Sequence, residues 1–546
     1  MHVGGLVSLF CYKNMKKVAG ALVLSCLLAG SAVGQSLDPA QDPLGEPPVQ
    51  VKVESLKLTG NTELPDEVFA DILDGYKGRL LSFEDIRRIA EAVVTRYREN
   101  DFLTVSAYLP EQDLTDGEVT IQVVEAQIST IEVEGAKHYD PEFVRWMFKP
   151  ALSRQQAGGL PRRSEVQRQL LLLNDNMDLN VRSVIRESAE EGKVDLVLQV
   201  QDERPLHFGI DYNNLGAKAT GVHRLGGSFE WGDLSGRGDV LNLRYVESGL
   251  LNADTKGLDL FQVGYTAPLN NNGTYFDFSY ANSAFQAGQQ FAILDIRGDA
   301  DVFRAGVRHK LIRSPDANLD ITAGLAFQDI ENSILGTQIS RDRLRELTLG
   351  LSGDWVWGAG RNYGSVMLTQ DLGTALGGTD SNDPLASRQA GGGFTKLRFD
   401  LSRVQKLNDF SYMILRGAHQ TAFQPLPFAE QFGLGGISSV RGFNQSIYLG
   451  DTGYNMSAEI RFAPIESNRQ LFEVGAFIDH GGAAVKSPQP GEIPNATLTG
   501  AGVTFQFRLP KQTFIRADLG WPIGKSGGLG PTDDGPVPYL VFSKRF

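Results

Sequence analysis

The feature that most constrains this chain is a period-two alternation of apolar and polar side chains between Pro205 and Phe546. In one segment Leu347, Leu349 and Leu351 share a face, and small or charged residues occupy the opposite one. Three further segments repeat the division: 396–402, 456–462 and 515–521. A period of two indicates β-strands. A soluble sandwich also alternates, but a charged inner face under an apolar belt, sustained over so many strands, is typical of a transmembrane β-barrel.

The alternating region divides into about sixteen segments, an even number of the kind found in bacterial outer-membrane barrels. A barrel of that size leaves an aqueous channel unless something fills it. Long polar connections such as 377–384 are expected to be extracellular loops, and short ones such as 270–273 to be turns at the opposite end. The fold class predicted for 205–546 is therefore a transmembrane antiparallel β-barrel.

The N-terminal residues 1–34 have the organisation of a secretory signal peptide. Basic residues at 15–17 precede an apolar run over 18–29, and small residues at 32–34 suit cleavage. Export from the cytoplasm is the expected consequence. No later run of about eighteen apolar residues predicts a transmembrane helix.

Two points about this segment stay open at the level of sequence. Translation can start at Met1 or at Met15, because the basic region begins at the second methionine. Both cysteines, Cys11 and Cys26, precede the expected cleavage site, so the mature chain would lack thiol chemistry. A lipoprotein anchored through Cys26 is the disfavoured alternative, because apolar sequence continues beyond it.

Between the signal and the barrel the pattern predicts two small α+β modules. A Pro-containing lead at 35–50 comes first, followed by modules at 51–127 and 128–204. Each module reads as a β-α-α-β-β unit of about seventy-five residues, and the alternation over 51–56 predicts the first strand of the first module. In the first, Ser82 and Asp85 have the spacing of a capping box at a helix start. Unrelated α+β domains are the alternative to a true repeat.

One long connection in the barrel, at about 422–452, carries an unusual motif. It contains the glycine-rich stretch 433–436 and then Val440-Arg441-Gly442-Phe443. An arginine set between apolar and glycine residues predicts a loop folded into the barrel with one fixed cation. An ordinary surface loop with one exposed arginine is the alternative. In the following strand the alternation directs Asp479 towards the lumen.

The segment 107–119 resembles the end of the first POTRA module in two-partner secretion transporters, the TpsB or haemolysin-secretion family. The family's order of signal peptide, two periplasmic POTRA domains and outer-membrane barrel matches nearly the whole mature chain. The resemblance implies two sets of functional residues: Val440, Arg441, Gly442 and Phe443 at a loop tip, and Phe477 and Asp479 on the inner wall. It further implies that Arg441 meets Asp479 or a neighbouring acid. The terminal Phe546 is similar to the signal read by the barrel-assembly machinery.

The function implied by this resemblance is secretion across the outer membrane. POTRA domains in the periplasm would capture an unfolded exported exoprotein, and the barrel, surrounded by outer-membrane lipid, would pass it outward. Two alternatives stay open. A barrel-assembly insertase shares the barrel and the loop but usually carries three or more POTRA domains. The second alternative, a passive porin, does not explain the loop motif.

Other classes of function lack support in the sequence. The histidines have no metal-ligand spacing, and no phosphate-binding loop or nucleophile motif occurs, so no enzyme, cofactor or metal is expected. The net charge of −13 argues against nucleic acid as a partner. Many members of the family plug the barrel with an N-terminal helix. The lead at 35–50 is too short for such a helix and its linker, so either the plug is absent or the inward-folded loop and the other loops close the pore alone.

Overall fold

The computed structural model describes residues 50–546, except 250–256, 381, 466–467, 469 and 530–534. The expected signal peptide and nearly all of the Pro-containing lead lie outside the described residues. The described chain forms two compact units that meet in sequence at Glu203 and Arg204. Each is considered by itself.

The first unit begins with a module whose sheet has the order β2-β5-β4. Its elements are β1 (Gln50–Lys52), β2 (Ser55–Thr59), η1 (Asp66–Phe69), α2 (Ala70–Asp74), β3 (Leu80–Ser82), α3 (Phe83–Glu99), β4 (Val105–Tyr108) and β5 (Glu118–Glu125). The single strand predicted at 51–56 is wrong, because β1 pairs with β3 while β2 pairs with β5. The capping box at the start of α3 is confirmed: Ser82 and Asp85 exchange hydrogen bonds.

The second module repeats the plan with the sheet order β6-β8-β7. Its elements are β6 (Gln127–Glu134), α4 (Pro141–Phe148), η2 (Lys149–Leu152), α5 (Ser153–Gln156), α6 (Arg163–Leu173), β7 (Leu179–Glu187) and β8 (Lys193–Asp202). At the end of β8 the Asp202 carboxylate accepts hydrogen bonds from the backbone N–H groups of residues 137–139. Burial alone would raise the pKa of Asp202, but these hydrogen bonds outweigh it and hold the pKa below its usual value.

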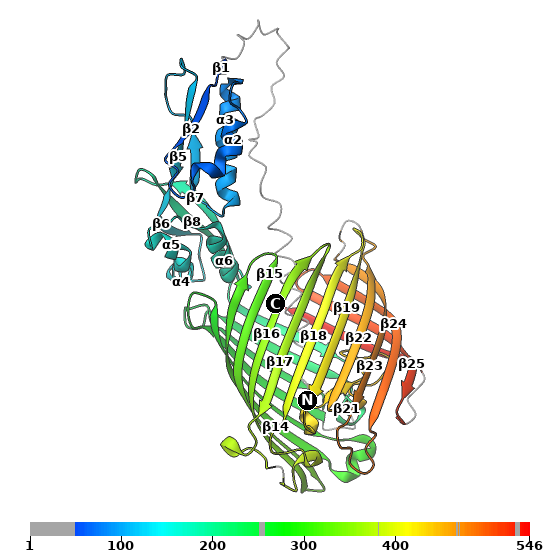
Figure 1. Cartoon of the computed structure of the whole chain (residues 1–546). Coiled ribbons are helices and arrows are strands. Elements are labelled where there is room, and N and C mark those ends of the chain that lie inside the picture. The colour runs from blue at the N-terminus through cyan, green and yellow to red at the C-terminus, as the bar shows by residue number, and fades with distance from the viewer. Residues whose placement is uncertain (1–49, 250–256, 381, 466–467, 469, 530–534) are drawn as a thin grey trace. The chain divides into compact units, whose positions relative to one another are not determined.

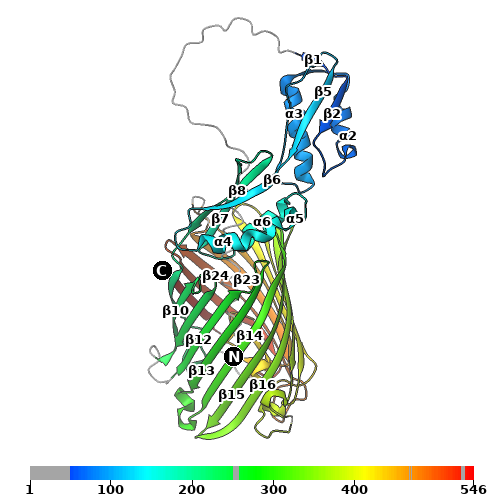
Figure 2. The same cartoon turned by 90° about the vertical axis from the view of Figure 1, so that its left-hand side faces the viewer.

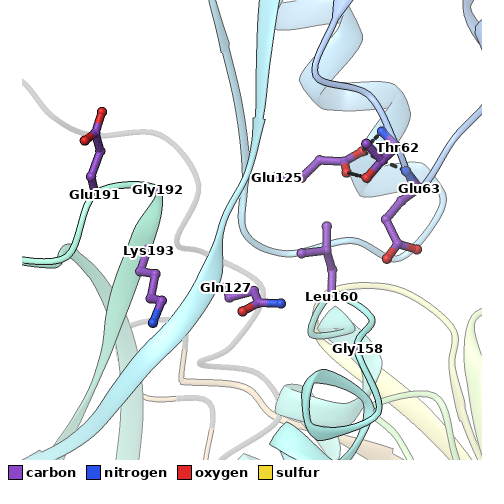
Figure 3. A pocket seen from close by; sticks show the side chains of 9 residues that line it. All are labelled: Thr62, Glu63, Glu125, Gln127, Gly158, Leu160, Glu191, Gly192 and Lys193. Carbon is purple, nitrogen blue, oxygen red and sulfur yellow. Dashed lines mark hydrogen bonds between the residues drawn. The ribbon is translucent and has the colours of Figure 1, made fainter.

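The two modules are joined through their sheets and their cores. Only Ala126 separates β5 from β6, so one strand continues into the other (Figure 2). Leu160 of the second module is buried in the core of the first. A hollow of about 280 Å³ lies at this junction (Figure 3). Its Glu125 carboxylate accepts from Thr62, Glu63 and Tyr97, which all belong to the first module.

The second unit is a closed antiparallel barrel of sixteen strands, which confirms the predicted fold class (Figure 1). In order around the wall the strands are β9 (Leu206–Asn213), β10 (Arg224–Gly232), β11 (Val240–Glu247), β12 (Gly257–Pro268), β13 (Thr274–Gln286), β14 (Arg297–Arg313), β15 (Ala317–Ile334), β16 (Thr337–Trp357), β17 (Gly360–Asp371), β18 (Thr395–Lys406), β19 (Ser411–Ala422), β22 (Thr452–Phe462), β23 (Phe472–Ala484), β24 (Asn495–Leu509), β25 (Thr513–Ser526) and β26 (Val537–Arg545). Short 3₁₀ segments lie in its loops: η3 (Lys218–Thr220), η5 (Gln289–Leu294), η6 (Ala375–Gly377), η7 (Ser387–Gln389) and η8 (Phe428–Glu430).

The barrel wall separates apolar from charged side chains as the alternation predicts. Leu349 and Leu351 on β16 are exposed on the outside, as is Ile478 on β23. Inward-facing charged residues such as Glu459 and Asp479 are almost completely buried. Closure is completed between the last strand and the first, where β26 pairs with β9 from Arg545↔Gly209 to Val541↔Asn213.

Within the described residues no helix is long and apolar enough to cross a membrane. The same residues hold no group of histidine, cysteine and acidic side chains suited to binding a metal ion.

Candidate functional site

The long connection between the eleventh and twelfth barrel strands, β19 and β22, folds back into the barrel. Its stem is a two-stranded hairpin of β20 (Phe432–Leu434) and β21 (Tyr448–Gly450). Residues 435–447, here called the loop tip, lie between these strands. Val440 and Phe443 of the tip are buried in an apolar cluster with residues of β23 and β24. The predicted inward-folded loop is therefore present in the structure.

Glycine lets the tip approach the wall closely. Gly442 has a φ of +97°, a left-handed conformation that favours glycine. A Cβ at this position would lie 2.7 Å from the backbone of Trp521 on β25. On the wall, a Cβ at Gly500 would lie only 1.8 Å from the carbonyl oxygen of Arg441. Both glycines are therefore required by the contact between tip and wall.

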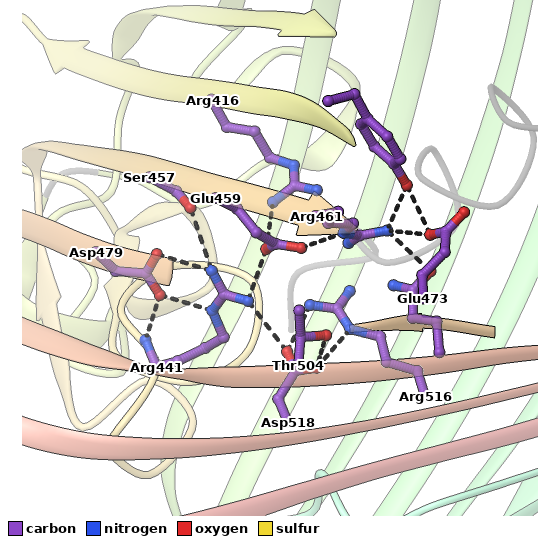
Figure 4. Close-up of polar contacts among 12 residues, drawn as sticks. Arg416, Arg441, Ser457, Glu459, Arg461, Glu473, Asp479, Thr504, Arg516 and Asp518 are labelled. Carbon is purple, nitrogen blue, oxygen red and sulfur yellow. Dashed lines mark hydrogen bonds and ion pairs between the residues drawn. The ribbon is translucent and has the colours of Figure 1, made fainter. Parts of the chain in front are cut away.

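Arg441 and Asp479 form a bidentate pair at the centre of this contact (Figure 4). Arg441 Nε lies 2.7 Å from Asp479 Oδ2, and its second nitrogen, Nη2, lies 2.9 Å from Oδ1. The backbone N–H of Arg441 also donates to Asp479, at 3.1 Å. The two side chains are 2% and 1% exposed. A planar guanidinium that meets a carboxylate through two parallel hydrogen bonds has a fixed orientation.

Two further acids share the same guanidinium. Arg441 Nη1 lies 2.9 Å from Glu459 on β22 and 3.1 Å from Asp518 on β25. The guanidinium carbon lies 3.3 Å from the centre of the Phe477 ring, in a cation–π contact. The structure thus places both predicted wall residues, Phe477 and Asp479, against the predicted tip.

These acids are in turn balanced by arginines of the wall (Figure 4). Glu459 is paired with Arg461 and, at 3.5 Å, with Arg416. Asp518 accepts hydrogen bonds from Thr504 and Arg516. Because each buried charge has opposite charges beside it, the cluster avoids the penalty of an isolated ion in a dry site.

Tyr539 on β26 fixes the backbone of the tip. Its hydroxyl accepts from the N–H of Gly442 at 2.9 Å and donates to the carbonyl of Phe443 at 2.6 Å. Both hydrogen-bonding functions of this buried hydroxyl are therefore used by the tip. Sequence reasoning missed Tyr539 and Gly500, because only the fold brings them to the tip. It placed Glu459 and Asp518 on the inner face but did not connect them with Arg441.

The same loop contacts the opposite side of the barrel near its start. Glu430 accepts a hydrogen bond from Gln328 of β15 at 2.8 Å and pairs with Lys396 of β18. Counted from β9, β15 is the seventh strand, whereas β25, which supplies Asp518, is the fifteenth. Strands eight apart in a ring of sixteen lie on opposite walls. The loop therefore spans the lumen.

The remaining predicted site residue, Phe546, lies at the closure of the barrel and away from the loop tip. Its N–H donates to the carbonyl of Phe208 on β9 at 2.8 Å, and its side chain is exposed. The ring borders an outward-facing hollow of about 450 Å³ that is lined mainly by apolar residues of β9, β10 and β11.

A sixteen-strand barrel that follows two such modules, with an arginine tip held on its inner wall, defines an outer-membrane protein of the POTRA–barrel class. Sequence profiles agree with this class: the POTRA domain of ShlB type matches residues 51–126, and the haemolysin secretion/activation protein ShlB/FhaC/HecB matches residues 192–507. The chain belongs to the ShlB/FhaC/HecB family of haemolysin secretion/activation proteins.

Individual proteins are similar over most of the chain. The haem/hemopexin transporter protein HuxB of Haemophilus influenzae is 24% identical over 77% of this chain and 74% of its own length. The outer membrane transporter CdiB of Dickeya dadantii is 24% identical over 86% of this chain and 82% of its own. Among solved structures, CdiB from Escherichia coli matches with a TM-score of 0.73 and 21% identity over 100% and 99% of the two chains. BamA from Haemophilus ducreyi, lacking POTRA domains 1–3, matches with a TM-score of 0.56 and 14% identity over 91% of this chain and 100% of that chain. These structural matches establish the fold.

Proposed function

We propose that this chain captures one unfolded exoprotein with its POTRA domains and passes it through the barrel to the cell surface or the medium. The main observation that supports this proposal is that the loop tip is held on the inner wall, where Arg441 contacts Asp479 and Phe477. A passive porin has no need of such an anchored element. Family membership supports the same direction, because the family is one of secretion proteins.

The free edge of β7 is the proposed capture site in the second POTRA domain. The opposite edge of its sheet, β6, is blocked: the Gln155 side chain binds both the N–H and the C=O of Ile128. On β7 the Asn174 side chain binds Val181 in the same way. Beyond that point, in the described chain, the outward backbone groups of Ser183 and Ile185 have no hydrogen-bond partner.

An extended exoprotein segment can pair with this edge. Backbone groups of residues two apart in a strand point to the same side, so Ser183, Ile185 and Glu187 present donors and acceptors in the direction already used by Val181. Main-chain pairing gives affinity without demanding one sequence, which suits a long unfolded chain. Val184 and Ile185, both more than 40% exposed, add apolar contacts beside the edge.

The charged cluster then serves to hold the loop tip in one position during transport. Removing one partner of a buried ion pair costs about 3–5 kcal/mol, because the other charge stays buried without compensation. The three acids that pair with Arg441 lie on β22, β23 and β25. Loss of one charge would therefore disturb contacts on all three strands. The tip therefore has a single strongly favoured position. It is a fixed element of the lumen past which an exoprotein can move.

The remaining expectations belong to the same proposal. The chain acts without catalysis, cofactor or nucleic acid, enters the periplasm by its signal peptide, and conducts ions when its pore opens. Phe546 serves as the C-terminal signal for the barrel-assembly machinery. Its exposed ring beside apolar side chains of β9 and β10 faces outer-membrane lipid after assembly.

A deletion strain tests the proposed function. The culture medium and the outer membrane of the wild type and the deletion strain are compared by quantitative mass spectrometry. Loss of one large secreted protein, with the other barrel proteins unchanged, is the expected result and identifies the exoprotein. Depletion of many barrel proteins with no missing secreted protein would instead establish an insertase and overturn the proposal.

A further inference from the structure

A second buried guanidinium, that of Arg388, lies at the base of the inward-folded loop. Arg388 is in the connection 372–394, between β17 and β18, and its side chain is 2% exposed. It donates to Asp451 at 2.9 Å and to the carbonyl of Leu426 at 2.7 Å. Leu426 and Asp451 stand near the two ends of the loop between β19 and β22. The Arg388 side chain thus forms hydrogen bonds near both ends of the loop.

The same guanidinium reaches a third connection, 485–494, between β23 and β24. Its Nε lies 2.8 Å from Glu492 Oε1, and this hydrogen bond holds the pKa of the Glu492 carboxyl below its usual value. Asp451 extends the contact, since its second oxygen accepts from the N–H of Lys486 at 2.6 Å. Three outer connections therefore meet at Arg388. Its four acidic and carbonyl partners, Leu426, Asp451, Lys486 and Glu492, come from two of these connections.

The backbone around Arg388 is held in an unfavourable conformation. Arg388 and Gln389 have φ values of 56° and 52°, in the left-handed region that favours glycine. Such residues persist where the surrounding contacts determine the backbone, and they cluster at functional positions. Next to them, the Ser387 hydroxyl accepts from the N–H of Phe428, which joins connection 372–394 to the loop a second time.

We propose that Arg388 is a positioning residue that closes the pore at rest by clamping the base of the inward-folded loop to connections 372–394 and 485–494. The loop spans the lumen from Glu430 at β15 to Arg441 at β25. A loop held only at its tip could swing at its base, and the lumen around it would open. Arg388 removes that freedom by fixing both ends of the loop.

The experiment measures ion conductance of the purified full-length protein in planar lipid bilayers. Arg388→Gln removes the charge and keeps most of the volume, and Glu492→Gln removes one partner in a partly exposed loop position. Asp295→Asn is the matched control, because Asp295 pairs with Arg297 and accepts a hydrogen bond from Gln286 in a different outer connection. We expect open time to rise at least several-fold in Arg388→Gln, less in Glu492→Gln, and not at all in Asp295→Asn.

A disulfide separates clamping from general stability. Ser387→Cys with Phe428→Cys, added to Arg388→Gln, joins the two connections covalently; the two cysteines of the sequence, Cys11 and Cys26, precede the expected cleavage site. Conductance should return to the wild-type level when the disulfide is oxidised and rise again on reduction. Wild-type conductance in both Arg388→Gln and Glu492→Gln would overturn the proposal. If Arg388→Gln fails to fold, Glu492→Gln decides alone.

This inference rests on the proposed transport function, because a resting pore has meaning only for a transporter. The two can fail separately, however. Conductance is recorded without any exoprotein, whereas the deletion experiment follows secretion and does not depend on the resting state of the pore.

Discussion

The lumen of the barrel and the second POTRA domain both hold an arginine between acidic residues, but in very different surroundings. In the lumen Arg441 contacts Asp479, Glu459 and Asp518, and all four side chains are at most 2% exposed. In the POTRA domain Arg186 lies 3.1 Å from Glu132 and 2.9 Å from Glu134, with exposures of 53%, 45% and 47%. The distances are alike, but the exposure of the two clusters differs sharply.

This difference in burial shows which kind of contact gives each unit its specificity. A buried pair that loses one partner leaves a charge without compensation, so the lumen cluster fixes the geometry of the loop tip. An exposed pair contributes only about 0–1 kcal/mol. The POTRA domain therefore does not rely on charges for capture. It offers a free strand edge, which is a backbone feature.

The largest effect is expected where the wall touches the tip. Gly500→Ala would place a methyl group 1.8 Å from the Arg441 carbonyl, so the tip must leave its position. Overpacking of this kind costs about 1–3 kcal/mol. Secretion should nearly cease while the barrel still assembles, as heat-modifiable migration on gels would show.

Gly227→Ala is the control for this change. Gly227 is also a glycine of the barrel wall, on β10, but a Cβ there meets nothing within 4 Å. Its secretion should equal that of the wild type. Equal secretion by the two variants would show that the position of the tip does not matter for transport.

A smaller loss is expected at the capture edge. Ile185→Pro removes one outward N–H on β7 and leaves the pairing with β8 intact, because that N–H points away from β8. Secretion should fall several-fold. Ile185→Thr, which keeps the N–H, should lose much less. A greater loss in the threonine variant would mean that the exoprotein binds to side chains and not to the strand edge.

Tyr539→Phe tests the backbone anchor of the tip. The change removes both hydrogen bonds to Gly442 and Phe443 with almost no change in volume. The buried N–H of Gly442 then lacks its acceptor, at a cost of about 1–3 kcal/mol. Secretion should fall about two- to five-fold, a loss between those of Ile185→Thr and Gly500→Ala. The tip's conformation can be followed by a spin label at Gln445.

The pH dependence of the second POTRA domain offers a further test. The pKa of Asp202 is lowered on folding, so its ionised form stabilises the folded state at pH values above its unfolded pKa of about 3.9. That stabilisation is lost as pH falls through the folded pKa. Asp202→Asn should therefore cost about 1 kcal/mol at pH 7, and the cost should be smaller in acid, below the folded pKa. Hydrogen exchange of residues 137–139 in the full-length protein measures both values.

The smallest effect is expected for the exposed pair. Arg186→Ala should change the stability of the POTRA domain by no more than about 0.5 kcal/mol and leave secretion unchanged. Differential scanning fluorimetry and the secretion assay check this. A loss as large as that of Gly500→Ala would contradict the contrast between buried and exposed charges.

Much of the fold could be predicted because its signals are local. The alternation of apolar and charged residues gave the barrel and its strand number, and the capping box of Ser82 and Asp85 gave the start of α3. The split of 51–56 into β1 and β2 was missed, because it depends on pairing with β3 and β5, which are distant in sequence. Local periodicity carries no information on such pairings.

The candidate site was only partly accessible from the sequence. The motif around Arg441 and the inward direction of Asp479 follow from spacing and resemblance. The participation of Glu459, Asp518 and Tyr539 depends on how far the loop descends and where its tip lands on the wall. Arg388 gave no signal, because its partners come from connections far away in the chain.

The most direct test of the central claim is secretion of the exoprotein by strains that carry Arg441→Ala or Asp479→Ala, with Arg297→Ala as the control for an exposed pair. We predict that both lumen variants lose most secretion and show altered channel conductance, while the control matches the wild type. Normal secretion and conductance in both lumen variants, with normal amounts of folded barrel, would contradict the claim that a fixed loop tip is needed for transport.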